Sequence, residues 1–275
     1  MSSPFNDVLA ELNRARGLDF SGYRQSMIQR RVRARMMRLR CDSPELYLQR
    51  LRSDPTECDH LIDTIAINVS EFFRDPIVWE ILAQSILPEI LERKSQEGVH
   101  EIRAWSAGCA AGEEAYSLAI LLDQAIEGES ARWRTLIFGT DIDQQTLEEA
   151  ATGIYPRESV GNVKLDILDR YFSVEGDRFE VDPALRSQVC FSTADLTSSA
   201  GHAPSDSVFG TFDLVLCRNV LIYFSRELQA RVSETLLRSL APRGYLILGP
   251  SESLSPQIKS SLNVVDRRNR VYQIR

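Results

Sequence analysis

The segment 102–119 constrains the fold more than any other part of this 275-residue chain. A short apolar run ends at Gly108, a second glycine follows at Gly112, and a helical pattern then begins with Glu113 and Glu114. A strand, a glycine turn and a helix in this order open a nucleotide-binding unit of the Rossmann kind. We therefore expect an α/β protein with a Rossmann-like parallel sheet.

The glycine turn differs from the turns that bind pyrophosphate. Its spacing is not G-x-G-x-x-G, and the sequence contains no G-x-x-x-x-G-K-[ST] segment. Gly108 can take a positive φ or let a ligand approach the backbone closely. Two interpretations of Glu113 and Glu114 stay open here: they favour the helix N-terminus, or they face a cationic or hydroxyl-rich ligand.

Strand and helix patterns alternate after this unit. An apolar strand over 135–141 ends at Asp141, where dinucleotide-type folds place an acid that accepts hydrogen bonds from ribose hydroxyls. Residues 212–217 and 245–249 continue the sheet, and an antiparallel hairpin over 262–274 should end it. A ligand is then expected along the carboxyl ends of the strands. Four residues map to that edge: Gly108, Asp141, Asp195 and Asn219.

Two parts of the chain lie outside this alternation. Residues 153–193 are interpreted as a small antiparallel β-subdomain inserted into the sheet pattern, with a hairpin turning at Gly176 and a further strand over 189–193. The first 70 residues carry four amphipathic helical patterns. We expect an all-helical domain over 1–75 and an α/β domain over 76–275.

The helical pattern over residues 22–40 is strongly basic. Seven arginines and no acid lie between Phe20 and Cys41, so the net charge of −7 leaves −14 on the rest of the chain. A solvated helix face is one interpretation, but we favour a docking surface for an acidic partner. Four arginines share one face: Arg24, Arg31, Arg35 and Arg38. The acidic remainder disfavours a protein that coats nucleic acid.

A polar turn follows the last of these helical patterns, in the segment Asn68-Val-Ser-Glu-Phe-Phe-Arg74. The side chains of Asn68, Ser70 and Arg74 could project from a single turn that the phenylalanines anchor in apolar surroundings. An arginine beside buried aromatic rings needs a partner such as a carboxylate.

Cysteine spacing and hydropathy indicate the cellular compartment in which the protein is expected. The five cysteines are scattered without a C-x-x-C pair, which indicates reduced thiols, no disulfide framework and no metal site. No apolar run approaches the roughly 18 residues of a membrane span, and the N-terminus lacks the pattern of a signal peptide. We expect a cytoplasmic protein that does not insert into the membrane.

Four motifs together resemble those of the CheR-type chemoreceptor glutamate methyltransferases, which use S-adenosylmethionine (SAM). They are Asn68-Val-Ser-Glu-Phe-Phe-Arg74, Trp105-Ser-Ala-Gly-Cys-Ala-Ala-Gly-Glu-Glu114, Thr140-Asp-Ile-Asp143 and Cys217-Arg-Asn-Val-Leu-Ile-Tyr-Phe224. Their order and spacing match over essentially the whole chain. The resemblance implies methyl transfer from SAM to glutamate side chains of methyl-accepting chemoreceptors, giving methyl esters and S-adenosylhomocysteine without a metal.

The resemblance also assigns roles to residues. Those implied to contact the cofactor, together with Gly108, are Asn68, Ser70, Arg74, Glu114, Asp141, Asp195 and Asn219. Arg74 and Tyr223 would also face the substrate glutamate, although packing beside Phe224 is an alternative for Tyr223. The basic helix would dock a monomeric enzyme on the cytoplasmic helical bundle of the receptor. The β-subdomain binds a receptor C-terminal peptide in some relatives.

The chemistry implied by the resemblance needs little acid–base help. A glutamate with a pKa of about 4.3 is already ionised at neutral pH. Catalysis would come from positioning and desolvation, with Arg74 orienting the carboxylate and Tyr223 donating one hydrogen bond. Two alternatives were weighed. A nucleic-acid methyltransferase is disfavoured because Asn219-Val-Leu-Ile lacks the prolines of an N-P-P-Y motif, and a SAM-binding regulator without catalysis stays open.

Overall fold

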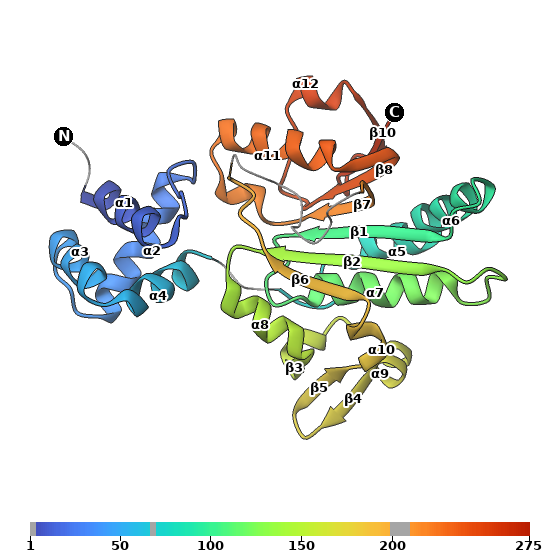
Figure 1. The fold of residues 1–275 in the computed structure, drawn as a ribbon, viewed down its shortest axis with the longest axis horizontal. Helices are drawn as coiled ribbons and strands as arrows, with labels where there is room; N and C mark the ends of the chain where they lie inside the picture. The colour runs from blue at the N-terminus through green and yellow to red at the C-terminus, as the bar shows by residue number, and fades with distance from the viewer. Residues whose placement is uncertain (1–3, 67–69, 199–209) are drawn as a thin grey trace.

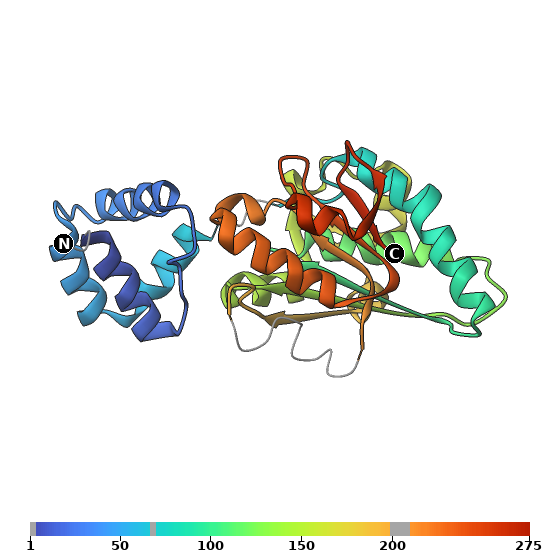
Figure 2. The ribbon, with the colours of Figure 1, turned by 90° about the horizontal axis from the view of Figure 1, so that it is seen from above.

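A computed structural model describes residues 4–66, 70–198 and 210–275 (Figure 1). Residues 4–66 form a helical unit, and the remainder forms an α/β unit around a seven-stranded sheet. Figure 2 shows the helical unit lying to one side of the α/β unit, near the start of α11 (Arg226–Arg238). The predicted combination of a helical part, a Rossmann-like sheet and a small antiparallel sheet is confirmed.

The helical unit consists of α1 (Pro4–Arg16), α2 (Gln25–Arg38), α3 (Pro44–Ser53) and α4 (Pro55–Ile65). Both α3 and α4 begin with a proline, which suits a helix start because the N–H it lacks has no helical partner there. The side chain of Ser43 accepts a hydrogen bond from the N–H of Leu46 at 3.3 Å, as the predicted cap requires. The apolar faces of the four helices pack into a core of their own.

The main sheet has the strand order β6-β2-β1-β7-β8-β10-β9. Its first five strands are parallel, and β10 and β9 are antiparallel, which confirms the predicted terminal hairpin. The strands are β1 (Glu101–Ala107), β2 (Arg134–Asp141), β6 (Val189–Thr193), β7 (Phe212–Cys217), β8 (Leu240–Leu248), β9 (Leu262–Asp266) and β10 (Val271–Ile274). Every residue of β7 is buried, as expected of a central parallel strand covered on both faces.

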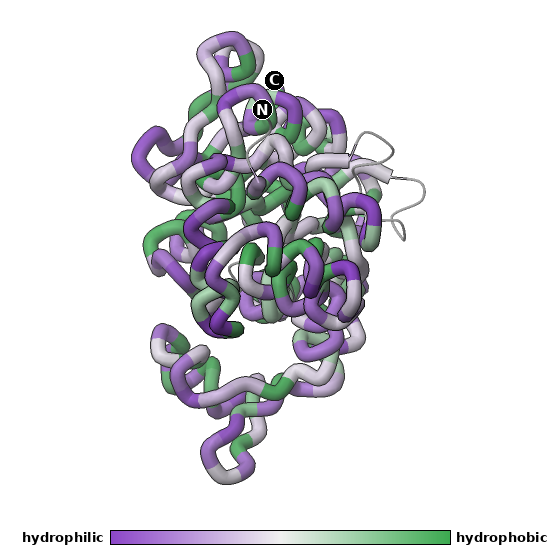
Figure 3. Tube along the Cα trace, turned by 90° about the vertical axis from the view of Figure 1, so that its left-hand side faces the viewer, coloured by the Kyte–Doolittle hydropathy of each residue, from purple (hydrophilic) through white to green (hydrophobic). Residues whose placement is uncertain are grey.

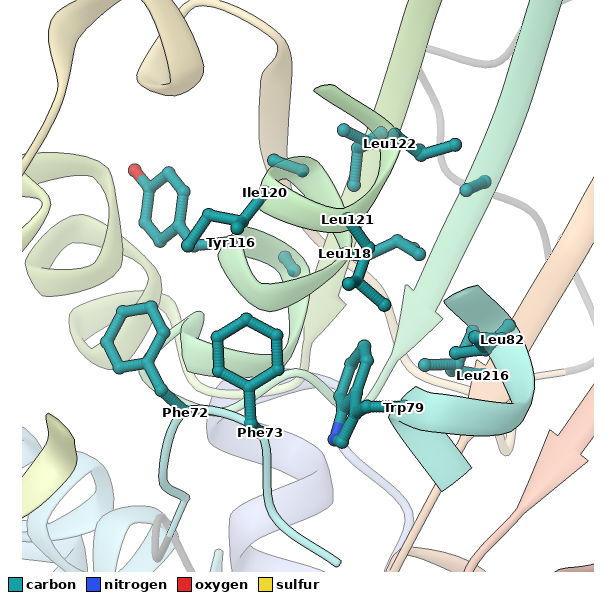
Figure 4. Packing of buried hydrophobic residues seen from close by; sticks show 14 of the residues in the cluster. Phe72, Phe73, Trp79, Leu82, Tyr116, Leu118, Ile120, Leu121, Leu122 and Leu216 are labelled. Carbon is teal, nitrogen blue, oxygen red and sulfur yellow. The ribbon is translucent and has the colours of Figure 1, made fainter. Parts of the chain in front are cut away.

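Helices cover both faces of this sheet and make two further cores. One face carries α5 (Pro76–Ile81), a π-helical segment (Leu82–Ile86), α6 (Leu87–Gln96) and α7 (Glu113–Ile126). The other face carries α11 and α12 (Pro256–Lys259). Figure 4 shows how the first core continues past α7 to the rings of Phe72, Phe73 and Trp79, so the predicted polar turn is anchored in the core of the α/β unit.

A three-stranded antiparallel sheet projects from the rest of the α/β unit, as Figures 1 and 3 both show. Its order is β3-β5-β4, and the predicted hairpin turns at Gly176, where φ is +62°. The elements of this region are α8 (Gln144–Thr152), β3 (Ile154–Pro156), a 3-10 turn (Arg157–Val160), α9 (Leu165–Tyr171), β4 (Phe172–Glu175), β5 (Arg178–Val181) and α10 (Pro183–Arg186).

The predicted insertion over 153–193 is wrong at its C-terminal end. Strand β6 does not join the small sheet but pairs in parallel with β2, with Val189 opposite Ile137. Close packing across this pair explains the difference, because a Cβ atom at Gly139 would lie 2.6 Å from the ring of Phe191. The glycine leaves room for the ring, and this fit between segments about 50 residues apart is not visible in the short strand itself.

No helix in the described part of the chain is both long and apolar enough to cross a membrane.

Candidate functional site

A cleft lies at the carboxyl ends of the parallel strands, where the helical unit meets the α/β unit. Its empty volume is about 980 Å³, part of it open to solvent, which suits a small-molecule ligand. The helical unit contributes Tyr23, Ile65 and Ala66 to its wall. The α/β unit contributes carboxylates, arginines and glycine-loop residues, of which the most relevant are Ser70, Arg74, Gly108, Glu114, Asp141, Asp195, Arg218, Asn219 and Tyr223.

The turn from Ser70 to Asp75 forms one wall of the cleft in an unusual backbone conformation. Phe73 and Asp75 have φ values of +53° and +57°, which are costly for residues other than glycine. The turn is held by its buried rings and by a hydrogen bond of 3.0 Å from the N–H of Phe73 to Ser117 Oγ. Such strain persists only where the surroundings enforce it, so this turn presents Arg74 in a fixed direction.

Arg218 is the buried cation behind this turn. Its side chain is only 2% exposed and follows directly after β7. The guanidinium donates to the backbone oxygen of Arg74 at 3.0 Å, to Asp75 Oδ2 at 2.7 Å and to Glu114 Oε2 at 3.2 Å. Trp79 donates a second hydrogen bond to the same Arg74 oxygen, at 2.8 Å. Arg218 therefore ties the strained turn to the start of α7.

Glu113 and Glu114 have different environments although they are adjacent at the start of α7. Glu114 lines the cleft and accepts a hydrogen bond from Ser106 Oγ at 2.7 Å. Glu113 is buried away from the cleft, where it accepts from Ser159 Oγ at 3.2 Å, and burial raises the pKa of its carboxyl. Of the two interpretations of these glutamates, contact with a ligand therefore fits Glu114. Glu113 instead holds the 3-10 turn Arg157–Val160 through Ser159.

Asp141 lies at the carboxyl end of β2, as predicted. Its oxygens accept hydrogen bonds from the N–H groups of Ala110 at 2.9 Å, Ile142 at 2.8 Å and Asp143 at 3.2 Å. Burial raises the pKa of this carboxyl, and the three N–H groups oppose the rise. The bond from Ala110 also fixes the glycine loop, so Asp141 both faces the cleft and shapes it.

The turn after β1 requires glycine at position 108. Gly108 has a φ of +77°, and a Cβ atom there would lie 2.4 Å from Val220 Cγ2. Any side chain would therefore push against the loop after β7 as well as strain the backbone. The two loops at the carboxyl ends of β1 and β7 can approach each other only because position 108 is glycine.

Asn219 is placed by a buried carboxylate. It has a φ of +61°, in the left-handed region that asparagine tolerates better than most residues. Glu252 is 3% exposed and accepts from the N–H groups of Asn219 at 3.1 Å, Ile222 at 3.3 Å and Gly249 at 2.6 Å. Burial raises the pKa of the Glu252 carboxyl despite these bonds. The carboxylate fixes the loop that carries both Asn219 and Tyr223.

Tyr223 lines the cleft from the loop after β7, in the 3-10 turn Leu221–Tyr223. Burial raises the pKa of its hydroxyl, and the positive charges of Arg31 and Arg74 oppose the rise. Tyr223 is half-buried and packs partly against the core of the helical unit, so the alternative of packing describes part of its environment. Tyr223 nonetheless lines the same cleft as Arg74.

The structure brings together nearly all the residues predicted for the site. Those that line the cleft are Ser70, Arg74, Gly108, Glu114, Asp141, Asp195, Asn219 and Tyr223. Asn68 lies outside the described residues. The roles of these residues in binding or catalysis stay predictions.

One predicted docking arginine has a different role. Arg35 is 10% exposed and makes a bidentate ion pair with Glu57 of α4, with distances of 2.8 and 2.7 Å. Tyr47 donates to the same carboxylate at 2.7 Å. Burial alone would raise the pKa of Glu57, but the hydrogen bonds from Arg35 and Tyr47 lower it. Arg35 is therefore a structural residue of the helical unit, because an acid from another helix neutralises it.

Three contributors to the cleft were missed by the sequence analysis. Arg218 stands inside a recognised motif, and its place directly after the apolar run 212–217 was the available signal. Glu252 and Tyr23 had no comparable signal, since their partners lie far away in the sequence. Tyr23 lies near enough to Asp141 and Asp195 that their charges add to the burial that raises its pKa.

The described ranges 4–66, 70–198 and 210–275 contain no group of three or more His, Cys, Asp and Glu side chains that could hold a metal ion.

Comparison with known families matches both parts of the chain. The family described as "CheR methyltransferase, SAM binding domain" matches residues 68–271, which include the α/β side of the cleft. The family described as "CheR methyltransferase, all-alpha domain" matches residues 3–66.

Individual relatives cover most of the chain. A chemotaxis protein methyltransferase of Listeria monocytogenes is 30% identical over 86% of this chain and 85% of its own length. Chemotaxis protein methyltransferase 1 of Pseudomonas aeruginosa is 35% identical over 71% of this chain and 69% of its own length. An uncharacterized 104.1 kDa protein of Rhodobacter capsulatus is 34% identical over 93% of this chain, which spans only 26% of that longer protein.

Proposed function

Since this chain belongs to the CheR methyltransferase family, we propose that it transfers the methyl group of SAM to glutamate side chains of chemoreceptors. The products are glutamate methyl esters and S-adenosylhomocysteine, and the enzyme acts as a monomer in the cytoplasm. The names of the relatives from Listeria monocytogenes and Pseudomonas aeruginosa support a role in chemotaxis.

One observation carries this proposal most directly: a single cleft is lined by four acidic residues, Glu71, Glu114, Asp141 and Asp195, together with Arg74 and Tyr223. Two of the carboxylates, Asp141 and Asp195, have backbone donors on only part of their lone pairs, and Glu114 is paired with Arg218. A cavity lined in this way disfavours phosphate and suits a ligand with an amino group, a sulfonium charge and ribose hydroxyls. SAM has all three.

We assign the ligand contacts accordingly. Asp141 would accept hydrogen bonds from the ribose hydroxyls, and Glu114 would face the positively charged end of the ligand. Asp195, whose Oδ1 accepts from the N–H of Thr197 at 2.7 Å, would accept from the adenine amino group. Ser70, Asn219, the backbone at Gly108 and Asn68 would complete the binding set.

When bound, SAM supplies an electrophilic methyl group on a sulfonium centre. The residues of this chain then have to orient an ionised carboxylate and exclude water, because a glutamate with a pKa of about 4.3 needs no base. Arg74, held through its own backbone oxygen by Arg218 and Trp79, would orient that carboxylate. Tyr223 would donate one hydrogen bond, and its raised pKa keeps the hydroxyl protonated at neutral pH.

The reaction class is tested by transfer of radiolabelled methyl from SAM to a cytoplasmic fragment of a chemoreceptor, followed by mild alkali. We expect label on the receptor that alkali releases as methanol, the behaviour of a carboxyl methyl ester. Alkali-stable label would contradict ester formation. Binding of SAM in calorimetry without transfer to any of a panel of receptor fragments would support a SAM-binding regulator instead.

Docking on the receptor would use Arg24, Arg31 and Arg38 and not Arg35. Arg24 and Arg38 are exposed, and Arg31 is half-buried. An Arg38→Glu substitution should lower the rate at subsaturating receptor and leave Tm unchanged, and about 0.5 M salt should remove most of the difference through screening. Arg35→Ala should instead lower the free energy of unfolding by about 2 kcal/mol, since it leaves the buried Glu57 carboxylate without its cation and with Tyr47 as its remaining side-chain donor.

The two variants are distinguished by measuring rates across salt concentrations and Tm across pH. The pKa of Glu57 is lowered in the folded protein, so the pair with Arg35 stabilises fully above the ordinary value of 4.5 and loses this contribution as pH falls through the lowered value. The difference in Tm between wild type and Arg35→Ala should therefore shrink in acid. An Arg38→Glu variant with unchanged receptor kinetics at low salt would contradict the docking role.

A further inference from the structure

A short antiparallel bridge joins the helical unit to the loop that carries Tyr223. Tyr23 is the bridge partner of Phe224. The N–H of Arg24 donates to the backbone oxygen of Tyr223 at 2.8 Å, and the N–H of Ser225 donates to the oxygen of Gly22 at 2.9 Å. These two bonds connect residues about 200 positions apart, directly at the residue proposed to donate a hydrogen bond to the substrate.

Side chains reinforce the bridge on both sides. The rings of Tyr23 and Phe224 meet edge to face, with centroids 4.9 Å apart. Arg24 Nε donates to the backbone oxygen of Phe224 at 3.3 Å. The segment also lies tightly on α11, because a Cβ atom at Gly22 would be 2.7 Å from Leu228 Cδ2.

The loop is held from its other side by groups of the α/β unit. Glu252 accepts from the N–H of Ile222, and Gln229 Nε2 donates to the oxygens of Leu221 at 2.8 Å and Phe224 at 3.2 Å. These contacts surround Tyr223 in the sequence, whereas the oxygen of Tyr223 itself is bound by Arg24 of the helical unit. The bridge therefore completes the placement of Tyr223.

Helix α2 begins at Gln25, the residue after this bond. Further along the same helix, the charge of Arg31 acts on the Tyr223 hydroxyl. A partner that binds the basic face of α2 thus contacts a helix whose N-cap residue, Arg24, is hydrogen-bonded to the Tyr223 loop. The hydrogen bond from the N–H of Arg24 to the oxygen of Tyr223 therefore connects the docking helix to the cleft.

We propose that the backbone N–H of Arg24 is a positioning group for Tyr223, through which the helical unit sets the geometry of methyl transfer. This inference rests on the proposed function insofar as Tyr223 contacts the substrate. It assigns to the helical unit a part in turnover that is separate from its part in receptor affinity.

The backbone of Arg24 allows this N–H to be removed selectively. Its φ is −62° and its ψ is 113°, which proline adopts without strain, and it precedes the first helical residue, where no helical hydrogen bond is lost. The extended conformation of the bridge at Tyr23 also suits a residue before proline. Arg24→Pro removes the side chain and the N–H together, and Arg24→Ala removes the side chain alone.

The comparison of these two variants isolates the hydrogen bond. We expect kcat of Arg24→Pro to be about tenfold below that of Arg24→Ala, the effect of one hydrogen bond on a positioned group, with the same affinity for SAM and the same KM for the receptor fragment. In a Tyr223→Phe background, the two variants should have equal kcat, because the bridge then has no hydroxyl to position. Equal kcat in the wild-type background, or an undiminished tenfold ratio in the Tyr223→Phe background, would overturn the proposal.

Amide hydrogen exchange gives a readout that does not depend on activity. Exchange at residues 221–225 should be faster in Arg24→Pro than in Arg24→Ala. Exchange in α11 beyond its first turn should be the same in both variants. Unchanged exchange at residues 221–225 would refute the positioning role. Absence of methyl transfer by the wild-type protein to any receptor would refute only the proposed function, and the exchange experiment would still test the positioning role. If Arg24→Pro does not fold, Gly22→Ala, whose Cβ would press on Leu228, loosens the same bridge and is measured in the same way.

Discussion

An Arg74→Ala variant should lose about two orders of magnitude in kcat and keep part of its affinity for SAM. The loss has the size expected when a reacting group is no longer held in its productive orientation. Asp141, Glu114 and Asp195 line the cleft independently of this side chain, which is why binding should survive in part. Single-turnover rates at saturating receptor, with SAM affinity from calorimetry, measure the two effects separately.

The same position can distinguish orientation from charge. Negative charge on the substrate carboxylate disappears during methyl transfer, so a strong electrostatic clamp would stabilise the ground state more than the transition state. Arg74→Lys keeps the charge and loses the planar pair of donors. We therefore expect the lysine variant to recover little of the lost kcat. Full recovery would mean that charge alone suffices, and unchanged turnover in the alanine variant would remove Arg74 from the reaction.

Arg218→Met should have the largest effect on stability, a loss of about 3 kcal/mol. The substitution keeps the length of the side chain but leaves the Glu114 carboxylate, whose side chain is 12% exposed, without its cation. Breaking a buried ion pair typically costs about 3–5 kcal/mol. Asp75 is 46% exposed and can be solvated, which places the estimate at the lower end. For a unit of this size the loss corresponds to a fall in Tm of roughly 6–12 °C.

The double variant Arg218→Met/Glu114→Gln is the matched control for this loss. Removing the carboxylate charge as well should restore part of the stability, because the penalty comes from the unpaired charge and not from the methionine. Activity should not return, because Glu114 is itself assigned to the positively charged end of the ligand and because Arg218 also holds the backbone oxygen of Arg74 in a strained turn. Recovery of kcat together with Tm would contradict this second role.

Much of the fold follows from patterns that are local in the sequence. Ser43 and Pro44 begin α3 as cap and first helical residue, and the glycine at position 108 permits the first strand to turn into α7. The run 212–217 is apolar on both faces because a central parallel strand is covered on both sides. Each of these features depends on a few neighbouring residues, so the order of strands and helices and the edge that carries the cleft could be predicted.

The residues of the candidate site could be predicted where a motif places them at the carboxyl end of a parallel strand, because these ends meet at one edge of the sheet. Asp141 and Asn219 illustrate this, because topology brings the carboxyl ends of β2 and β7 to the same cleft. The geometry of the site was not predictable to the same degree. Glu252, which places Asn219, and Tyr23, which contacts Phe224, carry no pattern that reveals these partners.

What only the tertiary structure decided is the choice of partner between distant segments. The sequence determined that α2 is basic, but the structure showed that Glu57 neutralises Arg35. It determined that 189–193 is a strand, but packing of Phe191 against Gly139 assigned that strand to the main sheet. Local propensity depends on neighbours along the chain, whereas ion pairs, strand partners and the Arg24–Tyr223 bridge depend on distances through space that form only when the whole chain has folded.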